Sequence, residues 1–335
     1  MNDFAGSHIL SVNQLDREAI STIFATANTM IPYAQRKKRT QVLDGAILGN
    51  MFFEASTRTR VSFGSAFNLL GGFVRETTGI SSSALSKGES LYDTARVLSS
   101  YADVIAMRHP ESGSVAEFAT GSLVPVINGG DGTNEHPTQA LLDLYTIEKE
   151  LAGNVQSIDN MHIAMVGDLK FGRTVHSLSK LLAQYKNITF SLISPKELAM
   201  PDEVISIIEN AGHRVIISDV LEGNLNADIL YLTRIQEERF PNPEEANKYR
   251  GQFRLNQHIY TQYCKSNTVI MHPLPRDSRK EANELDVDLN VNPNLAIFRQ
   301  VENGVLIRMA LFALTLGVAD QVTQHESEVN WFSRK

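Results

Sequence analysis

Residues 46–60 read Ala46-Ile-Leu-Gly-Asn-Met-Phe-Phe-Glu-Ala-Ser-Thr-Arg-Thr-Arg60, and this stretch indicates the fold class. It begins with a short apolar run of strand length and ends with a cluster of hydroxyl and guanidinium side chains. Residues 61–70 then have the spacing of a helix that continues from the Ser-Thr-Arg turn. A strand that leads directly into a helix is the repeating unit of parallel α/β sheets.

The same alternation continues through the rest of the chain. Further apolar runs of strand length lie at residues 103–107, 124–127, 162–166, 188–193, 229–233 and 269–271. Helical spacing is found at residues 20–31, 138–151, 174–185 and 304–316. We therefore expect an α/β protein with two doubly wound domains, in which helices flank parallel sheets and the C-terminal helix packs back on the first domain.

The polar segment 152–160 interrupts the alternation and is the best candidate for a domain boundary. The first expected domain is residues 1–151, together with a C-terminal helix at about 300–320. The second is residues 152–299, and a polar, loosely held tail follows at 321–335. Ligands of open α/β domains bind beyond the carboxyl ends of the strands, so the residues after each strand are the candidate site residues.

Composition and charge exclude several classes of protein. The chain has 335 residues, enough for two domains, and its formal net charge of −7 argues against a general nucleic-acid binder. Cys264 is the only cysteine, which excludes an intrachain disulfide and a thiolate metal cluster. Residues 1–14 lack the order of a secretory signal, and no apolar run approaches the ~20 residues that span a bilayer. We expect a cytoplasmic protein with no metal, cofactor, nucleic-acid partner or membrane association.

Two segments of the first half suit an anionic ligand. The cluster Ser56–Arg60 opens a helix, where free N–H groups and the helix dipole favour an anion, and its hydroxyls and guanidinium fork match phosphate. The alternative is an ordinary serine N-cap with solvated arginines. Arg108 follows a second strand and is a candidate ligand for phosphate or a carbonyl oxygen, with a surface arginine as the alternative.

His136 and Gln139 follow a third strand and lie three apart at the start of a helix, so they face the same direction. A histidine can donate to a carbonyl oxygen, and a side-chain amide can accept from an NH₂ group. The pair therefore suits a small molecule with a C(=O)NH₂ end. A capped helix with a structural histidine is the alternative.

Segments of the second half also follow strands. Gly167–His176 looks like a dinucleotide turn but lacks the G-x-G-x-x-G spacing, so we reject a nicotinamide site. Arg234 and Gln236 lie two apart in an expected loop. In His272–Arg276, two prolines stiffen a segment whose carbonyls can bind a ligand amide. The serine-rich stretch 81–89, in the first half, has the composition of a mobile linker.

Together these segments resemble the catalytic chains of the aspartate carbamoyltransferase family, from about residue 9 to residue 316. The motifs that carry the resemblance occur in the family's order at Phe52–Arg60, Met107–Pro110, His136–Gln139, Val166–Lys170, Gly172–His176 and His272–Arg276. The resemblance implies transfer of a carbamoyl group from carbamoyl phosphate to L-aspartate, by direct amine attack through a tetrahedral intermediate. That transfer is the committed step of pyrimidine biosynthesis.

The resemblance also implies roles for individual residues. The phosphate would be held by Ser56, Thr57, Arg58, Thr59 and Arg108. The carbonyl oxygen would be bound by Thr59, Arg108 and His136, and the amide nitrogen by Gln139 and the backbone of Pro273 and Leu274. The carboxylates of aspartate would be bound by Arg173, Arg234 and Gln236.

Catalytic chains of this family form a homotrimer with sites between subunits. The resemblance therefore implies that Ser83 and Lys87 enter from the neighbouring chain, which replaces the linker interpretation of their loop. Some family members carry a second lysine where this chain has Ser86, a difference that affects loop charge. A regulatory chain or a dihydroorotase is a possible further partner that the sequence neither requires nor excludes.

The nearest alternative is an ornithine carbamoyltransferase-like enzyme, because that family shares the phosphate motif. It typically has a cysteine in the His-x-Leu-Pro position and a Ser-Met-Gly signature, whereas this chain has Pro273 there and no Ser-Met-Gly. Arg234 and Gln236 suit a dicarboxylate acceptor. A second alternative is a non-catalytic assembly relative, which the intact set of arginines with His136 and Gln139 disfavours.

Overall fold

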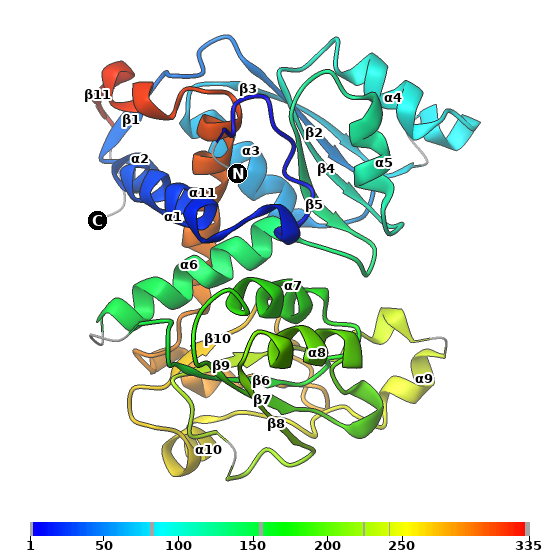
Figure 1. Cartoon of the computed structure of the whole chain (residues 1–335), viewed down its shortest axis with the longest axis vertical. Helices are drawn as coiled ribbons and strands as arrows, with labels where there is room; N and C mark the ends of the chain where they lie inside the picture. Colours follow the sequence, from blue (N-terminus) through cyan, green and yellow to red (C-terminus); the bar gives the residue numbers. More distant parts are fainter. Residues whose placement is uncertain (1–2, 81–83, 154–156, 224, 241, 332–335) are drawn as a thin grey trace. The chain divides into compact units, whose positions relative to one another are not determined.

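The structure, a computed structural model, describes residues 3–80, 84–153, 157–223, 225–240 and 242–331. Contacts between Cα atoms divide the chain into two compact units, which are drawn in Figure 1. The first unit is Met1–Leu141 with Glu302–Lys335, and the second is Leu142–Val301. Both divisions fall inside helices, α6 (Pro137–Gly153) and α11 (Ile297–Thr315). The domain limits expected near residues 151 and 300 stay a prediction.

The first unit contains a parallel four-stranded sheet in the order β3-β2-β4-β5. Its strands are β2 (Ile47–Phe52), β3 (Phe73–Thr78), β4 (Val104–His109) and β5 (Val126–Asp131). Besides α6 and α11, the unit has the helices α1 (Arg17–Thr29), α2 (Ile31–Ala34), α3 (Thr57–Leu69), α4 (Leu91–Leu98) and α5 (Ser114–Gly121). It also has the 3-10 helices η1 (Val12–Gln14), η3 (Ala84–Lys87) and η7 (Ala319–His325).

The first helix forms where the apolar spacing predicted it. Its buried face is Ala19, Ile20, Ile23, Phe24 and Ala27. Asp16 begins the helix as its N-cap and accepts a hydrogen bond from the Ala19 N–H at 2.8 Å. Local capping and a buried stripe therefore agree, which is why the helix could be predicted without tertiary information.

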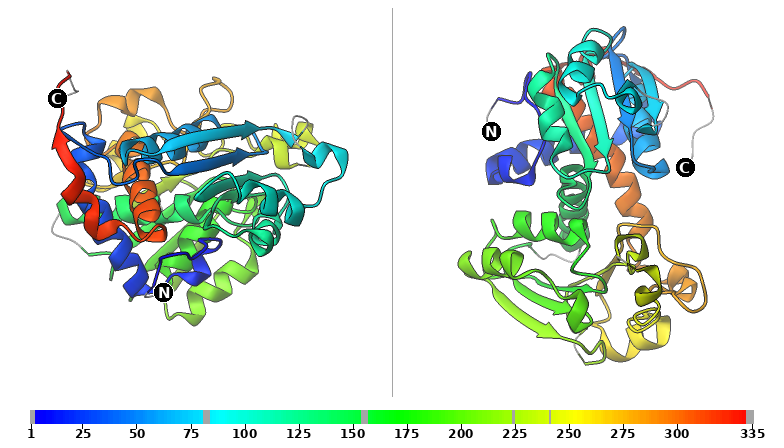
Figure 2. Two further views of the ribbon diagram at one scale, coloured as in Figure 1. Left: turned by 90° about the horizontal axis from the view of Figure 1, so that it is seen from above. Right: turned by 90° about the vertical axis from the view of Figure 1, so that its right-hand side faces the viewer.

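The C-terminal helix packs on the first unit as predicted. Phe312 of α11 meets Phe67 of α3 edge-on, with ring centroids 4.9 Å apart, and α11 can be followed in orange in Figure 2. No single helix in the described part of the chain is long and apolar enough to cross a bilayer. The pair formed by α11 and η7 meets that length and composition together, but it is bent by 106°.

The tail is more ordered than predicted. Strand β11 (Glu326–Glu328) pairs antiparallel with β1 (Lys38–Thr40). The Tyr33 hydroxyl donates a hydrogen bond at 2.9 Å to Glu326 Oε2, which belongs to the first residue of β11. The prediction of a loosely held tail at 321–335 is therefore wrong for this strand, because its polar groups bind an N-terminal segment of the chain.

The second unit contains a parallel five-stranded sheet in the order β10-β9-β6-β7-β8. Its strands are β6 (His162–Val166), β7 (Thr189–Ile193), β8 (Arg214–Ser218), β9 (Ile229–Leu232) and β10 (Val269–Met271). Its helices are α7 (Arg173–Leu182), α8 (Asp202–Asn210), α9 (Pro243–Ala246) and α10 (Gln257–Tyr263), with the 3-10 helices η4 (Lys196–Leu198), η5 (Glu237–Arg239) and η6 (Val287–Val291). The inner strands are almost continuously apolar and buried, as parallel strands covered on both faces should be. The predicted α/β class with parallel sheets is confirmed.

Candidate active site

Helix α3 begins at the hydroxyl and guanidinium cluster, as the sequence predicted. Ser56 is its N-cap residue, and the Ser56 carbonyl accepts a hydrogen bond from the Arg60 N–H at 3.1 Å. The Ser56 hydroxyl makes no capping bond to the helix, so the interpretation as an ordinary serine cap does not describe this turn. Thr57 and Arg58 are exposed and Thr59 is half-buried. The first turn therefore presents hydroxyls and a guanidinium at a helix N-terminus.

Arg108 is the penultimate residue of β4, in register with Phe52 at the end of β2. Its residue is only 9% exposed, so it is not a surface arginine at a strand end. One guanidinium nitrogen, Nη2, lies 2.7 Å from Glu54 Oε2, and the other, Nη1, donates to the Gly129 carbonyl at 3.2 Å. These contacts hold the cation at the carboxyl edge of the sheet, next to the turn that starts α3.

His136 immediately precedes α6 and is buried. Its carbonyl accepts hydrogen bonds from the N–H groups of Gln139 and Ala140 at 3.0 and 3.1 Å, which is how the helix begins. The segment before it is held by the buried Asp131 carboxylate, which accepts from the Glu135 N–H at 3.1 Å. His136 is thus fixed just before α6 and Gln139 on its first turn, both within the first unit.

A buried arginine that the sequence analysis did not single out connects these two helices. Arg308 of α11 is 4% exposed. Its Nη1 donates to Ser62 Oγ of α3 at 2.8 Å, and its Nη2 to Thr138 Oγ1 of α6 at 3.4 Å. The guanidinium carbon lies 4.8 Å from the centre of the Phe63 ring. The signal in the sequence was a single arginine inside an otherwise apolar helical run.

In the second unit, β10, β9 and β6 are neighbours, so their carboxyl ends lie side by side. Gly167 follows β6 with φ +113°, and a Cβ there would lie 2.2 Å from the Thr233 carbonyl oxygen, so only glycine fits. The buried Asp168 carboxylate accepts from the Phe171 N–H at 2.9 Å and from the Gln236 N–H at 3.1 Å. Asp168 thereby joins the loop after β6 to the loop after β9. Burial raises the pKa of Asp168, and these N–H donors oppose that shift.

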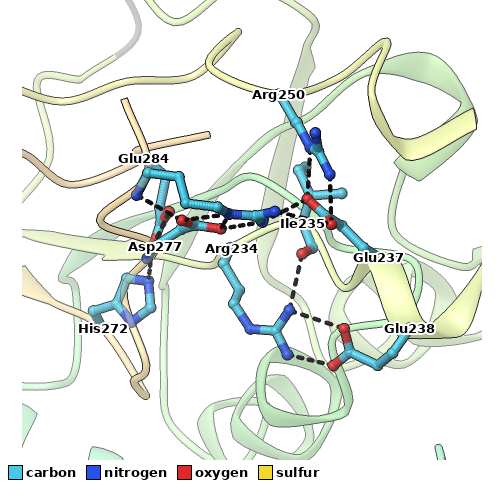
Figure 3. Close-up of polar contacts among 9 residues, drawn as sticks. Arg234, Ile235, Glu237, Glu238, Arg250, His272, Asp277 and Glu284 are labelled. Atoms are coloured by element: carbon cyan, nitrogen blue, oxygen red, sulfur yellow. Dashed lines mark hydrogen bonds and ion pairs between the residues drawn. The ribbon is translucent and has the colours of Figure 1, made fainter. Parts of the chain in front are cut away.

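Two of the predicted acceptor-site arginines follow these strands. Arg173 is the first residue of α7 and is 9% exposed. Arg234 follows β9, and its Nη1 donates to Glu238 Oε2 at 2.9 Å and to the Ile235 carbonyl at 3.0 Å, as Figure 3 shows. The same loop carries Gln236, so the Arg-x-Gln motif forms one short, internally bonded segment.

The loop after β10 is shaped by a histidine that the sequence analysis treated only as part of a motif. His272 Nδ1 accepts a hydrogen bond from the Leu274 N–H at 2.8 Å. Nε2 of the same ring therefore carries the proton that it donates to Glu284 Oε1 at 2.8 Å, a contact drawn in Figure 3. Leu274 has φ +59°, in the left-handed region that non-glycine residues rarely adopt. The buried histidine and glutamate thus fix the peptide of Leu274.

The structure places the predicted residues in two groups, one in each unit. The first unit carries Ser56, Thr57, Arg58, Thr59, Arg108, His136 and Gln139, and the second carries Arg173, Arg234, Gln236, Pro273 and Leu274. Lys87 is exposed at the end of η3. Ser83 lies outside the described residues. Within the described ranges, no cluster of three or more His, Cys, Asp or Glu side chains is arranged to hold a metal ion.

Comparison with known proteins identifies the family of the chain. Residues 7–149 match the carbamoyl-P binding domain of aspartate/ornithine carbamoyltransferase, and residues 159–315 match its Asp/Orn binding domain. The aspartate carbamoyltransferase catalytic subunit of Cellvibrio japonicus is 69% identical over 332 residues, 99% of this chain and 98% of that protein. The catalytic subunit of Saccharophagus degradans is 68% identical over 330 residues, 98% of each.

Solved structures agree with these relatives. The aspartate transcarbamoylase of Trypanosoma cruzi, solved in complex with carbamoyl phosphate and aspartate, has a TM-score of 0.85 and 36% identity to this chain. The match covers 93% of this chain and 98% of that one. With the family's two domains spanning most of its length, and with catalytic subunits as close relatives, the chain belongs to the aspartate/ornithine carbamoyltransferase family.

Proposed function

We propose that the chain transfers the carbamoyl group of carbamoyl phosphate to L-aspartate, giving N-carbamoyl-L-aspartate and phosphate in the committed step of de novo pyrimidine biosynthesis. The observation that carries the proposal is the pair of site-residue groups at the carboxyl ends of two parallel sheets. One presents an anion-binding turn beside a buried arginine, and the other an Arg-x-Gln loop beside a fixed backbone. The high identity to aspartate carbamoyltransferase catalytic subunits supports aspartate as the acceptor.

The phosphate group of carbamoyl phosphate is assigned to the first turn of α3. Ser56, Thr57, Arg58 and Thr59 supply hydroxyl, backbone N–H and guanidinium donors there, and Arg108 adds a second cation. At an effective dielectric near 20, one charge at about 4 Å contributes roughly 4 kcal/mol. Two guanidiniums and a helix N-terminus are therefore sufficient to dominate the binding of a small dianion.

Separate ligands are assigned to the two ends of the carbamoyl group. Thr59, Arg108 and His136 donate to the carbonyl oxygen, where negative charge develops. Gln139 and the carbonyls of Pro273 and Leu274 accept from the NH₂ group. His272 holds the Leu274 N–H, which belongs to the same peptide group as the Pro273 carbonyl. This bond and the left-handed backbone of Leu274 support a fixed direction for the Pro273 carbonyl.

Aspartate is assigned to the Arg-x-Gln loop and to Arg173. Two carboxylates need two cationic forks, which Arg173 and Arg234 provide, and Gln236 adds an amide donor. The expected domain limits follow from these assignments: residues 1–151, with the C-terminal helix, form the carbamoyl-phosphate-binding domain, and residues 152–299 the aspartate-binding domain.

The reaction needs no protein nucleophile. The aspartate amine attacks the carbamoyl carbon, a C–N bond forms, and the tetrahedral intermediate expels phosphate as the C–O bond breaks. The departing phosphate accepts the amine proton. Catalysis then comes from alignment of the two reactants, which can supply on the order of 7–11 kcal/mol, and from the donors around the developing oxyanion.

The decisive experiment compares aspartate with ornithine as acceptor, at matched carbamoyl phosphate and enzyme concentrations. We expect N-carbamoyl-L-aspartate from the purified chain and no citrulline. Citrulline as the main product would favour an ornithine carbamoyltransferase-like enzyme, and product from neither acceptor would favour a non-catalytic assembly relative. Phosphate release that requires no amino acid would also contradict the proposed transfer.

We further propose a cytoplasmic homotrimer in which Ser83 and Lys87 act in the site of the neighbouring chain. The exposure of Lys87 at the end of η3 leaves its ammonium accessible to another chain. Mixing inactive Lys87→Ala and Arg58→Ala chains should then restore part of the activity, because some sites in hybrid trimers receive both intact residues. Hybrids that form but remain inactive would contradict a shared site. A regulatory chain or a dihydroorotase would be an additional partner of such a trimer.

A further inference from the structure

Glu237, the first residue of η5, binds two arginines from different segments of the second unit. Arg250 approaches it with a bidentate pair, Nε to Oε1 and Nη2 to Oε2, both at 2.7 Å (Figure 3). Arg279 donates to Glu237 Oε1 from Nη2 at 2.8 Å. Glu237 directly follows Gln236, so its carboxylate ties the Arg-x-Gln loop to residues 13 and 42 positions further along the chain.

The ion-pair network continues into the loop after β10. Arg279 Nε also bonds both carboxylate oxygens of Asp277 at 3.0 Å. The Asp277 N–H donates to Glu284 Oε1 at 3.0 Å, and the same carboxylate oxygen accepts a hydrogen bond from His272 Nε2. His272 in turn holds the Leu274 peptide, so a continuous chain of hydrogen bonds runs from the Arg-x-Gln loop to the loop that carries Leu274.

The Arg-x-Gln loop is also bonded to the loop after β6. Asp168 accepts from the Gln236 N–H, which ties the loop after β9 to the loop after β6. Gln236 is therefore bonded through its own backbone to one neighbouring loop, and through the next residue's carboxylate to the other. The side chain of Glu237 has no place among the assigned substrate ligands, yet it connects two of the segments that carry them.

We infer that Glu237 is a positioning residue for the acceptor: its bonds to Arg250 and Arg279 hold Arg234 and Gln236 in the geometry that binds the two carboxylates of aspartate. This inference rests on the proposed function, because it assumes that the Arg-x-Gln loop binds the acceptor. A change at Glu237 should affect the binding of aspartate more than that of carbamoyl phosphate, since the aspartate ligands Arg234 and Gln236 lie in the same loop as Glu237. The phosphate ligands belong to the first unit and do not take part in the network.

The geometry distinguishes the Glu237–Arg250 pair from an ordinary surface ion pair. Isolated exposed pairs contribute little, because both side chains lose freedom and water screens the charges. Glu237 and Arg250 are only 21% and 23% exposed at their side chains, and both oxygens of the carboxylate are bonded. A bidentate, largely covered pair that joins separate segments restricts the loop far more than one exposed contact does.

The test removes the charge while keeping the shape. Glu237→Gln should raise the KM for aspartate about tenfold, the change that corresponds to the loss of about 1.4 kcal/mol of binding. The KM for carbamoyl phosphate and the kcat at saturating aspartate should stay within about twofold of the unmodified chain. Glu237→Asp, which retains the charge, should recover part of the aspartate affinity. Glu244→Gln, an exposed acid on α9 in the same unit, is the matched control and should leave all three constants unchanged.

A second variant tests whether the bond itself matters. Arg279→Met should also raise the KM for aspartate. The double variant should raise it by less than the two single effects combined, since both substitutions remove the Glu237–Arg279 contact. Additive effects in the double variant would overturn the inference. So would an aspartate KM within twofold of normal in folded Glu237→Gln, or a loss confined to thermal stability. A chain that fails to carbamoylate aspartate before any substitution would instead refute the proposed function.

Discussion

Arg108 combines a buried position with a permanent positive charge, and its neighbours explain how the fold tolerates this. Burial of an unpaired charge costs several kcal/mol, so a buried arginine needs an anion or strong acceptors nearby. Glu54 Oε2 at 2.7 Å and the Gly129 carbonyl supply them. The same cation lies beside the anion-binding turn of α3, so we expect its partners to change when phosphate binds.

Arg58 is exposed on the first turn of α3, where the phosphate is proposed to bind, so its removal should affect binding and not folding. We expect Arg58→Ala to lower kcat/KM for carbamoyl phosphate about 10²–10³-fold, the loss typical of one donor to a developing charge. Arg75→Ala, an exposed arginine on β3, is the control and should retain activity. Steady-state kinetics alongside circular dichroism would check both; near-normal turnover of Arg58→Ala would remove it from the site.

Two carboxylates of the ion-pair network should make stability depend on pH. Hydrogen bonds from Arg250 and Arg279 lower the pKa of Glu237, and those from Arg279 lower the pKa of Asp277. A folded pKa below the unfolded value of about 4 stabilises the fold above that pH, and the contribution disappears as pH falls through the folded pKa. The unmodified chain should therefore unfold at a higher temperature than Glu237→Gln/Asp277→Asn at neutral pH. Calorimetry should show this gap closing below about pH 4; a constant gap would contradict the pKa shifts.

At the scale of elements, α11 is an arginine-bearing core helix. It supplies Phe312 to the packing around α3 and Arg308 to the bonds with α3 and α6. Because α3 and α6 carry the phosphate turn and His136, a helix from the end of the chain sets the spacing of two elements from its first half. Site geometry in the first unit is therefore a property of three helices together.

Substitution of Arg308 should test this arrangement. Arg308→Met keeps much of the buried volume but leaves Ser62 and Thr138 without this donor, so we expect a loss of about 1–3 kcal/mol in the free energy of unfolding. The KM for carbamoyl phosphate should also rise. Arg299→Met is the control on the same helix: its ion pair with Glu150 is 44% exposed on the arginine side and should contribute at most about 1 kcal/mol. Urea unfolding would measure both, and equal losses would contradict a special role for Arg308.

Two of the strands that the sequence analysis missed lie at sheet edges. Strand β3 lies at one edge of the first sheet, and Phe73–Thr78 contains only two apolar residues at its start. Strand β8 lies at the edge of the second sheet, and its Ile217 is 63% exposed. Edge strands pack on fewer neighbours, so they tolerate polar residues, as β3 does after its first two positions.

At the scale of the molecule, the two units carry separate groups of ligands. The assignment of carbamoyl phosphate to the first unit predicts that inorganic phosphate alone protects that unit. In hydrogen exchange, phosphate should slow the amides of residues 57–60 and 138–140 and leave those of residues 234–239 unchanged. Chloride at matched ionic strength is the control. Protection of the Arg-x-Gln loop without protection of α3 would reverse the assignment of the units.

The α/β class with parallel sheets, the family and the candidate ligands could all be predicted from the sequence alone. These depend on local signals: apolar runs, a hydroxyl-rich helix start, and motifs in a characteristic order. The tertiary structure decided which distant residues support those ligands. The bonds of Arg308 to α3 and α6 and of Glu237 to Arg279 join residues far apart in the chain. The His272–Glu284 and Glu237–Arg250 pairs join residues 12 and 13 positions apart. These hydrogen bonds form only once packing has excluded water and brought the residues together. No local sequence pattern therefore predicts them.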